Sequence, residues 1–236
     1  MAARSYGQYC GLTTAVELIG ERWALLIIRD LLVGPRRYTD LKQGLPRIPT
    51  NILSTRLKEL QDAGVIRRVP LAHRGLVYEV TAYGRELEPI VLALGRWGFQ
   101  AMGEPADGDV VTADSFTIAL RSAFVADAAA ALPPTTYDVH LGEVGVRAGV
   151  SAEGLRVAPL AAGGWAPAGE ADVVLSAGFG IRRLISGELG PQQAQDAGVV
   201  EVRRGDPALL ERFAATFSIP PGSMPRSGVE AGADQG

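Results

Sequence analysis

Residues that support disulfide or metal chemistry are scarce in this chain of 236 residues, which has one cysteine, Cys10, and two histidines. A single cysteine excludes an internal disulfide, which suits a reducing compartment. No stretch of about eighteen uncharged apolar residues occurs, as a membrane-spanning helix would need. The first residues also lack a charged segment followed by an apolar one. We therefore expect a cytoplasmic protein.

Sequence features of enzymes are equally few. His140, the only histidine after residue 103, has no cysteine with which it could hold a metal ion. The stretch 176–180, Ser-Ala-Gly-Phe-Gly, is not a nucleophile elbow, and the glycine-rich stretches lack the lysine of a phosphate-binding loop. We expect no catalytic residue, no metal site and no cofactor, and hence no enzyme.

Charge is distributed unevenly along the chain. Residues 1–103 contain 14 Lys and Arg against 9 Asp and Glu, whereas residues 104–236 contain 9 against 17, so the net charge of −3 hides a basic first half. Within residues 36–74, nine basic residues occur with three acidic ones. Because the local field at a contact surface governs binding, we expect only the first half to meet a polyanion.

Composition also suggests where the domains end. Gly, Pro and Asp gather at 103–109, which is typical of a linker. We predict a first domain at 1–103, a linker at 104–111 and a second domain at 112–219. The Pro, Gly and small polar residues that follow predict a disordered tail at 220–236.

The first half has the pattern of a winged helix-turn-helix. Apolar residues at helical spacing predict helices from Thr13 or Thr14 to 19 and over 23–33, 38–44 and 50–60. Pro46 and Pro49 exclude a helix between the last two and predict a turn at 45–49. Two β-prone runs, 65–69 and 76–80, then flank a basic hairpin tip. Thr81 can cap a last helix that contains Leu87, Ile90, Leu94 and Trp97.

The predicted helix 50–60 has the composition of a helix that reads DNA. One face is apolar, and polar residues crowd its first half, which is the half that enters the major groove in such motifs. The basic residues before it suit phosphate contacts, and the hairpin tip suits the backbone or the minor groove. The predicted DNA-binding residues are Arg36, Arg37, Arg47, Thr50, Asn51, Ser54, Thr55, Arg56, Lys58, His73 and Arg74. The alternative is a solvated face on a winged helix that docks proteins, with Thr50 and Asn51 serving only as helix caps.

Several motifs in this half resemble those of the HxlR-type regulators. They are Tyr9-Cys10-Gly11, Ile19-Gly20-Glu21-Arg22-Trp23, the run from Leu32 to Tyr38, the run from Leu53 to Gly64 and the run from Tyr78 to Gly84. The resemblance covers about residues 9–98. It implies a MarR-like winged helix, a homodimer formed through the first and last helices, and binding to pseudo-palindromic operators in double-stranded DNA. Trp23 and Trp97 would then be core or dimer residues.

Cys10 allows two interpretations. Members of the resembled family often carry a cysteine here, and in some of them it senses oxidants or electrophiles as a thiolate. A position just ahead of a helix favours a reactive thiolate, but a small buried thiol fits the same position. We favour the structural role and keep a thiol switch as the alternative.

The second half has a mixed α and β pattern. A helix from Asp114 or Ser115 to Pro133 is predicted, followed by strands near 137–141, 144–150, 155–157 and 172–175, a helix at 180–187, a strand at 199–202 and a helix from Pro207. The stretches 171–175, 184–189 and 197–207, with Phe213 and Phe217, resemble the sterol-carrier-protein type 2 fold. This resemblance covers most of 112–218 and is less specific than the first.

The second resemblance implies an apolar cavity between sheet and helices that could hold a lipid-like or aromatic molecule. The predicted ligand-binding residues are Phe116, Leu120, Phe124, Trp165, Phe179, Leu184 and Ile185, any of which could equally be ordinary core. We therefore expect a two-domain protein: a mainly α winged helix-turn-helix followed by an α+β ligand domain. The predicted function is a DNA-binding regulator, a repressor modulated by a small apolar or aromatic ligand. The alternatives are a thiol switch through Cys10 and a lipid-carrier or scaffold protein that binds no DNA.

Overall fold

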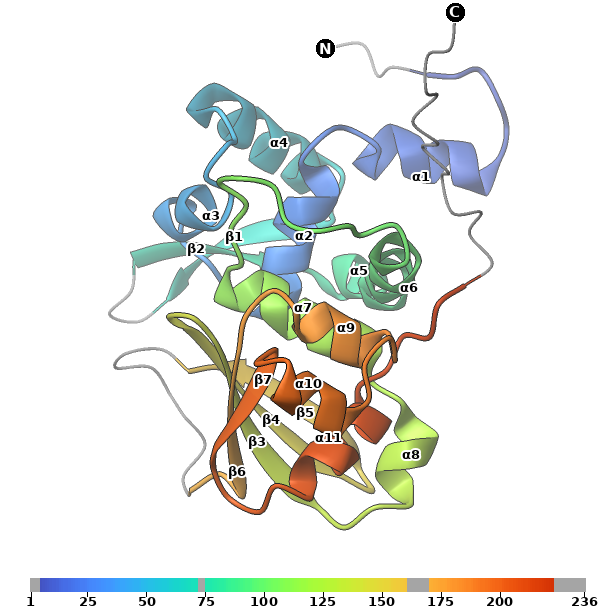
Figure 1. The fold of residues 1–236 in the computed structure, drawn as a ribbon. Coiled ribbons are helices and arrows are strands. Elements are labelled where there is room, and N and C mark those ends of the chain that lie inside the picture. Colours follow the sequence, from blue (N-terminus) through green and yellow to red (C-terminus); the bar gives the residue numbers. More distant parts are fainter. Residues whose placement is uncertain (1–4, 72–74, 161–169, 223–236) are drawn as a thin grey trace, which may run out of the picture.

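The computed structural model describes residues 5–71, 75–160 and 170–222. In the view of Figure 1 a mainly helical first part lies above a sheet that is flanked by helices. The first part consists of α1 (Gly11–Ile19), α2 (Ala24–Val33), α3 (Tyr38–Gly44), α4 (Thr50–Asp62), β1 (Ile66–Leu71), β2 (Gly75–Val80), α5 (Ala82–Arg85) and α6 (Glu88–Phe99). None of the helices in the described ranges is long and apolar enough to cross a membrane.

The helix-turn-helix lies where the sequence predicts it. Helix α3 has the predicted bounds, and α4 starts at the predicted Thr50 and continues to Asp62. Helix α1 begins earlier than predicted, at Gly11, because the carbonyl of Cys10 already accepts the backbone N–H of Thr14 at 3.0 Å. Local periodicity was therefore sufficient to locate the elements of the motif.

The last predicted helix of this part is two helices. The hydroxyl of Thr81 caps α5 as expected, accepting the backbone N–H of Gly84 at 3.0 Å. A Cβ atom at Gly84 would lie 2.0 Å from the carbonyl oxygen of Val65, so α5 lies directly against the residues that precede β1. The chain then turns at Leu87, and α6 packs on α2 and α7 instead.

The second part is built on a five-stranded sheet. Its elements are α7 (Ala113–Ala123), α8 (Ala126–Ala130), β3 (Thr135–Leu141), β4 (Val144–Ser151), β5 (Gly154–Pro159), β6 (Val173–Ala177), α9 (Ile181–Ile185), α10 (Pro191–Asp196), β7 (Val200–Arg204) and α11 (Leu209–Thr216). The strand order is β5-β4-β3-β6-β7, with β3 and β6 parallel and the other neighbours antiparallel. This agrees with the α+β class expected for the second domain.

In the second part of the chain, the sequence prediction differs from the structure mainly at two helices. The long helix predicted up to Pro133 is broken at Phe124, whose extended backbone forms a bridge with Phe217, and its first part is capped by Thr112 rather than by Asp114 or Ser115. Helix α10 was not predicted, because it is polar and only Ala194 in it is buried, which leaves no apolar periodicity to detect.

Helix α7 is shared between the two hydrophobic cores. Ile118 packs into the core of the first part with residues of α2, α3 and α4. Phe116 and Leu120 pack into the core under the sheet. Both faces of this helix are therefore buried, and the two parts of the chain are joined by packing as well as by the exposed segment 104–110.

Two charged contacts reinforce this junction. The guanidinium of Arg36, just after α2, pairs with the carboxylate of Asp114 in α7, with Nε 2.8 Å from Oδ2. Arg121 in α7 donates to the carbonyl of Leu32 at 3.3 Å and to the carboxylate of Glu88 in α6 at 3.2 Å. Because Arg36 and Asp114 are both largely shielded from water, their pairing is screened less than a surface ion pair.

A buried carboxylate lies beneath this junction. Asp30 in α2 is only 1% exposed, and its Oδ1 accepts from Nε of Arg29 at 2.8 Å. Its Oδ2 has no hydrogen-bond partner among the described residues. Burial, opposed by the charge of Arg29, raises the pKa of Asp30 to about 6. The folded chain therefore keeps this side chain protonated up to a higher pH than the unfolded chain does.

We expect Asp30→Asn to change how stability depends on pH. The pKa of Asp30 is higher in the folded chain than the ordinary value of about 3.9. Protonated Asp30 therefore contributes to the free energy of unfolding fully below about pH 4, and this contribution is lost as the pH rises through about 6. The free energy of unfolding of the variant, relative to the unchanged protein, should therefore rise by about 2 kcal/mol between pH 4 and 7.5. Urea unfolding followed by circular dichroism measures this difference.

Asp127→Asn, an exposed position on α8, is the matched control for the same measurement. It should show no such rise. Parallel pH profiles for Asp30→Asn and the unchanged protein would contradict the assignment.

Candidate nucleic-acid interface

Side-chain hydrogen bonds from α3 hold the turn that leads into α4 and the first residue of α4. The phenolic hydroxyl of Tyr38 donates to the carbonyl of Thr50 at 2.9 Å, and the ammonium of Lys42 donates to the carbonyl of Pro46 at 3.0 Å. Leu45 and Ile48 in the intervening turn are buried. The turn therefore presents α4 from a rigid base rather than from a loose loop.

One face of α4 is packed and the opposite face is open to solvent. Leu53, Leu57 and Leu60 are buried in the core of the first part. Thr50, Asn51, Ser54 and Lys58 are exposed, whereas Thr55 is half-buried and donates from its hydroxyl to the carbonyl of Asn51 at 2.9 Å. Lys58 pairs with Asp62 at 2.7 Å on the surface. The structure thus brings four of the six polar residues predicted in this helix to one accessible face.

Arg56 differs from the prediction. Its side chain is only 14% exposed and pairs with Glu21, at 3.3 Å, and with Glu59. Because Glu21 precedes α2, this arginine links α4 to the segment between α1 and α2 and is not presented as a donor for base edges. Helical spacing placed Arg56 on the polar side but could not show that a distant carboxylate holds it.

Arg36 also differs from the prediction. Its pairing with Asp114, together with a backbone bridge to Tyr78, makes it part of the domain junction rather than a phosphate contact. Arg37 and Arg47 are exposed, as a phosphate contact requires. Nη2 of Arg47 reaches the carbonyl of Gly108 at 3.3 Å and lies 3.9 Å from Asp109, so the segment that joins the domains runs beside it.

The wing consists of β1 and β2, which pair antiparallel from Ile66 and Val80 to Leu71 and Gly75. The predicted contacts His73 and Arg74, at the tip, lie outside the described residues. Two exposed arginines of β1 were not predicted as contacts: Arg67 pairs with Glu79 at 2.7 Å, and Arg68 lies 5.8 Å from the centre of the Tyr78 ring. The basic charge of the strand itself was the signal that could have identified them.

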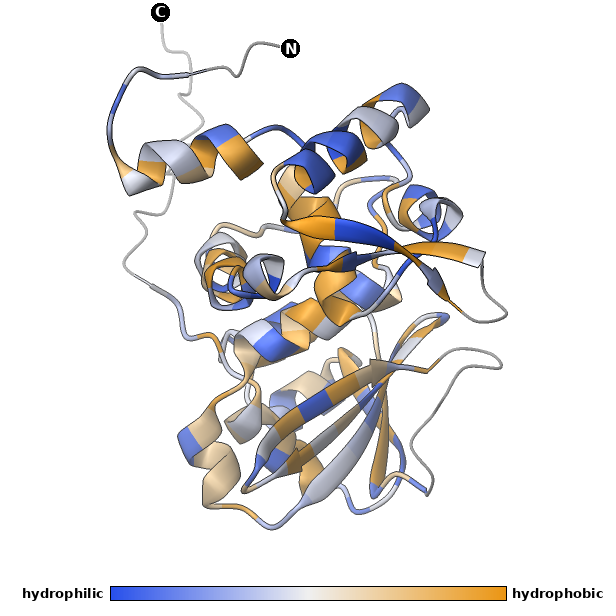
Figure 2. Cartoon of the chain, turned by 180° about the vertical axis from the view of Figure 1, so that it is seen from behind, coloured by the Kyte–Doolittle hydropathy of each residue, from blue (hydrophilic) through white to orange (hydrophobic). Residues whose placement is uncertain are grey.

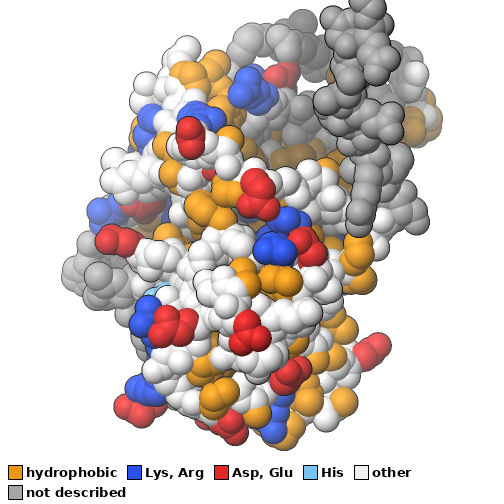
Figure 3. All heavy atoms as spheres, in the orientation of Figure 1, with side chains coloured by type: hydrophobic (Ala, Val, Ile, Leu, Met, Phe, Trp, Pro, Cys, Tyr) orange, Lys and Arg blue, Asp and Glu red, His pale blue; other side chains and the backbone are white. Residues whose placement is uncertain are grey.

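The charge pattern of the visible surface is mixed. On the face drawn in Figure 3, Lys and Arg side chains lie among Asp and Glu side chains rather than forming one continuous basic area. Some basic side chains of the first domain also have acidic neighbours, as Arg56, Lys58 and Arg67 do. The positive charge counted along residues 36–74 is therefore partly neutralised by nearby carboxylates.

A model of the HxlR-like helix-turn-helix family matches residues 18–105 of the chain. A transcriptional regulator from Synechocystis, sll1512, is 34% identical over 94 residues, which are 39% of this chain and 70% of that protein. The regulator YvaP of Bacillus subtilis is 35% identical over 85 residues, which are 35% of this chain and 79% of the YvaP chain. The chain belongs to the HxlR family of transcriptional regulators. Such a helix-turn-helix regulator binds DNA, and the match agrees with the resemblance expected for the first domain.

YodB of Bacillus subtilis is a further relative, 32% identical over 96 residues, which are 40% of this chain and 85% of YodB. The alignment with the structure of quinone-bound YodB covers 38% of this chain and 96% of the YodB chain, with 30% sequence identity and a TM-score of 0.34. The matched family model ends at residue 105, so the second domain lies outside it. The likeness of that domain to the sterol-carrier-protein type 2 fold stays a prediction.

Hydrophobic residues are exposed on the first and last helices of the HxlR-type domain. Helix α1 contains no buried residue and exposes Leu12 and Val16, with Tyr9 just before it. In Figure 2 this helix stands away from the rest of the domain. Helix α6 exposes Ile90, Leu94 and Trp97, the last 67% exposed. Several large apolar side chains exposed on the same helix are typical of a contact surface.

Cys10 lies at the N-terminus of α1 and is exposed, which contradicts the expectation of a small buried thiol. The backbone N–H groups of Thr13 and then Leu12, at the N-terminus of α1, favour the thiolate and lower the pKa of the Cys10 thiol. No cluster of three or more potential metal ligands exists among the described residues. Thiolate formation at this exposed position is therefore favoured relative to an ordinary cysteine.

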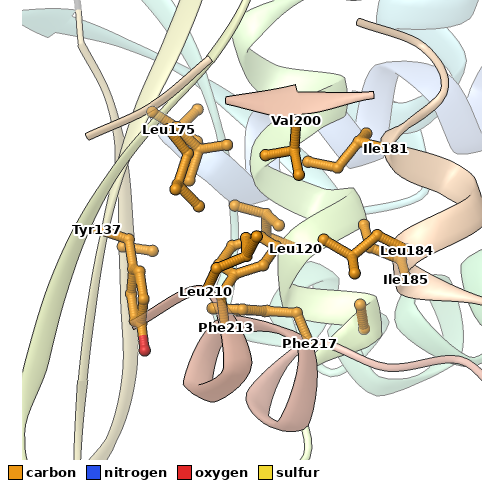
Figure 4. Close-up of a cluster of buried hydrophobic side chains, with 14 of the residues drawn as sticks. Leu120, Tyr137, Leu175, Ile181, Leu184, Ile185, Val200, Leu210, Phe213 and Phe217 are labelled. Carbon is orange, nitrogen blue, oxygen red and sulfur yellow. The ribbon is translucent and has the colours of Figure 1, made fainter. Parts of the chain in front are cut away.

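The predicted ligand cavity under the sheet is filled. Leu120, Leu184 and Ile185 are buried and pack with Tyr137, Phe213 and Phe217 (Figure 4). Phe116 belongs to the same buried cluster. The rings of Phe213 and Phe217 have their centres 4.8 Å apart. Phe179 is exposed, and Trp165 lies outside the described residues. The four buried positions are therefore core residues and Phe179 is a surface residue, because the side chains of Phe213 in α11 and Phe217 just after it pack into the same cluster.

We expect Arg56 and Lys58, two cations on the same helix, to contribute differently to stability, because Arg56 is largely buried and Lys58 is exposed. Arg56→Ala removes a largely buried guanidinium that pairs with Glu21 and Glu59 and packs between segments, and it should lower the free energy of unfolding by about 1–3 kcal/mol. Lys58→Ala removes an exposed pair and should cost less than about 0.5 kcal/mol. Urea unfolding measures both. Equal effects of the two variants would contradict the role given to Arg56.

Proposed function

We propose that this HxlR-family regulator binds pseudo-palindromic operators as a homodimer and acts as a repressor that a small molecule releases. The observation that carries the proposal is the exposed polar face of α4, held on a rigid turn by the Tyr38–Thr50 hydrogen bond. A recognition helix needs one packed face and one face of donors and acceptors that reach base edges. Both faces are present within the thirteen residues of α4.

Thr50, Asn51 and Ser54 are the proposed base contacts. All three are exposed in the first half of α4. An Asn side chain can donate to and accept from one adenine at the same time, which makes Asn51 the most discriminating of the three. Lys58, Arg37, Arg47 and Arg68 are the proposed phosphate contacts, because each is exposed and carries a flexible cationic side chain.

The proposed dimer forms through α1 and α6 with a second copy of the chain. Helix α1 buries none of its own residues in the single chain, so its apolar side chains need a partner to leave water. In a twofold dimer the same surface of each copy meets that of the other, so the exposed apolar residues of α1 and α6 would be covered in both copies at once. The two copies of α4 would then reach half-sites about 34–36 Å apart, one turn of DNA.

Besides a small-molecule ligand, oxidation or alkylation of Cys10 is a second candidate signal to which the regulator could respond. Its exposed thiol has a lowered pKa, and it lies at the start of α1, within the proposed dimer surface. The relative YodB has been crystallised with a quinone bound and after diamide treatment. Modification of Cys10 would place a new group in the dimer contact and so change operator affinity.

We expect Asn51→Ala to weaken operator binding by about 1–3 kcal/mol while binding to scrambled DNA changes little, because base contacts carry the specificity. Fluorescence anisotropy on DNA from upstream of the protein's own gene, at two salt concentrations, measures both. Gln61→Ala, exposed at the far end of the same helix, is the control and should leave both unchanged. Equal losses on operator and scrambled DNA would sink the assignment of Asn51. Absence of salt-dependent binding to either DNA would favour the protein-docking alternative.

We also expect Leu94→Asp to convert the dimer to a monomer, since it puts a charge in the centre of the apolar face of α6. Sedimentation velocity at micromolar concentration measures the mass. Ala119→Asp, exposed on α7, is the control and should stay dimeric. A monomeric unchanged protein, or a dimeric Leu94→Asp variant, would refute the proposed dimer surface.

A further inference from the structure

A cavity of about 810 Å³ lies at the junction of the two domains. Its walls come from the end of α2, from α5 and α6, from α7 and from strands β3, β4 and β5. This volume is in the range of small-molecule sites, which cluster at domain interfaces. Its sheet residues come from Thr136, Arg147, Gly149 and the strand β5, and three of its apolar residues, Phe124, Leu155 and Val157, belong to the filled core under the sheet or pack against it.

Part of the cavity wall is apolar. Leu32 and Leu92 contribute from the first domain, and Phe124, Leu155 and Val157 contribute from the second. Among the described residues of the predicted ligand set, Phe124 lines this space. A flat or elongated apolar body would therefore contact both domains at once.

The charged part of the wall has an excess of cations. Arg85 and Arg121 both pair with the single carboxylate of Glu88, at 4.0 Å and 3.2 Å respectively. Two guanidinium groups thus share one negative charge, and Arg85 is 58% exposed, with room for another acceptor. The other two arginines of the wall have their own acidic neighbours: Arg147 pairs with Asp138, and Arg156 with Glu153.

We propose that this junction cavity is the effector site and that it takes an organic anion with an apolar body, such as an aromatic or medium-chain carboxylate. The proposal rests on the proposed function as a ligand-responsive regulator. The carboxylate pairs with Arg85 and Arg121, and the body lies against Phe124, Leu92 and Leu155. A guanidinium binds a carboxylate through two parallel hydrogen bonds, so an anion is preferred over a neutral molecule of the same shape.

The cavity also has a short route to the DNA-binding elements. Val33 and Gly34 line it, and Arg36, two residues later, pairs its backbone with Tyr78 of β2 in both directions, at 3.0 Å and 2.8 Å. The side chain of Arg36 holds α7 through Asp114, and α3 begins at Tyr38. An occupant that spreads α7 and β5 from α2 would therefore act on the segment that positions both the wing and the helix-turn-helix.

Calorimetric titration of the full chain with 2-naphthoate and with neutral 2-naphthamide tests the site without DNA. We expect one 2-naphthoate per chain, bound at least tenfold more tightly than the amide. Arg85→Gln should weaken 2-naphthoate about tenfold and leave the amide unchanged, whereas Arg203→Gln, exposed on β7, should change neither. Decanoate, a medium-chain carboxylate, is titrated in the same way. Equal binding of acid and amide, failure of both 2-naphthoate and decanoate to bind, or no effect of Arg85→Gln would overturn the proposal.

Operator binding in the presence of 2-naphthoate then tests the effector role. Operator affinity should fall at least fivefold at saturating 2-naphthoate in the unchanged protein and in Cys10→Ser, and Arg85→Gln should need about tenfold more 2-naphthoate to reach half of this effect. Saturation of the cavity with no change in operator affinity would overturn the effector role. Failure to bind any operator would refute the proposed function while the titration still decides the site, so the two failures are distinguishable.

Discussion

Helix α7 has to satisfy two hydrophobic cores at once, and the relation between the domains depends on this constraint. Ile118 belongs to the core of the helix-turn-helix, and Phe116 and Leu120 belong to the core beneath the sheet. A helix with both faces buried cannot rotate without opening one of the cores. The pairing of Arg36 with Asp114 and the bonds of Arg121 to Leu32 and Glu88 then set its position along α2 and α6.

The same constraint explains why the space between the domains is not completely filled. Curved strands and straight helices meet across α7, and the side chains that line the gap from β4 and β5 are partly polar. Apolar packing at α7 therefore coexists with a cavity beside it, where Arg85 and Arg121 remain partly exposed. A small molecule that enters there meets both domains, which is the condition for a ligand to change their relation.

The arginines show how one residue type serves different roles in this molecule. Arg36 and Arg56 stabilise contacts between segments, whereas Arg37, Arg47 and Arg68 are exposed on the helix-turn-helix and wing. The planar guanidinium with its five donors suits both uses, because it can pair with a carboxylate inside the protein or with a phosphate outside it. The acidic second domain supplies the partner for Arg36, so charge balance and domain packing are coupled.

Local sequence was enough to predict α3, α4, the wing and most strands of the second domain, because apolar periodicity and proline or glycine breaks are short-range signals. The same signals identified the polar face of Thr50, Asn51 and Ser54. They could not show that Arg36 and Arg56 are held by Asp114 and Glu21, since those carboxylates are 78 and 35 residues away along the chain. Nor could they show that Phe213 and Phe217 fill the space predicted for a ligand, or that a cavity forms instead where α2, α6 and β5 meet. Ion pairing and cavity formation depend on which distant surfaces come together, and only the tertiary structure decides that.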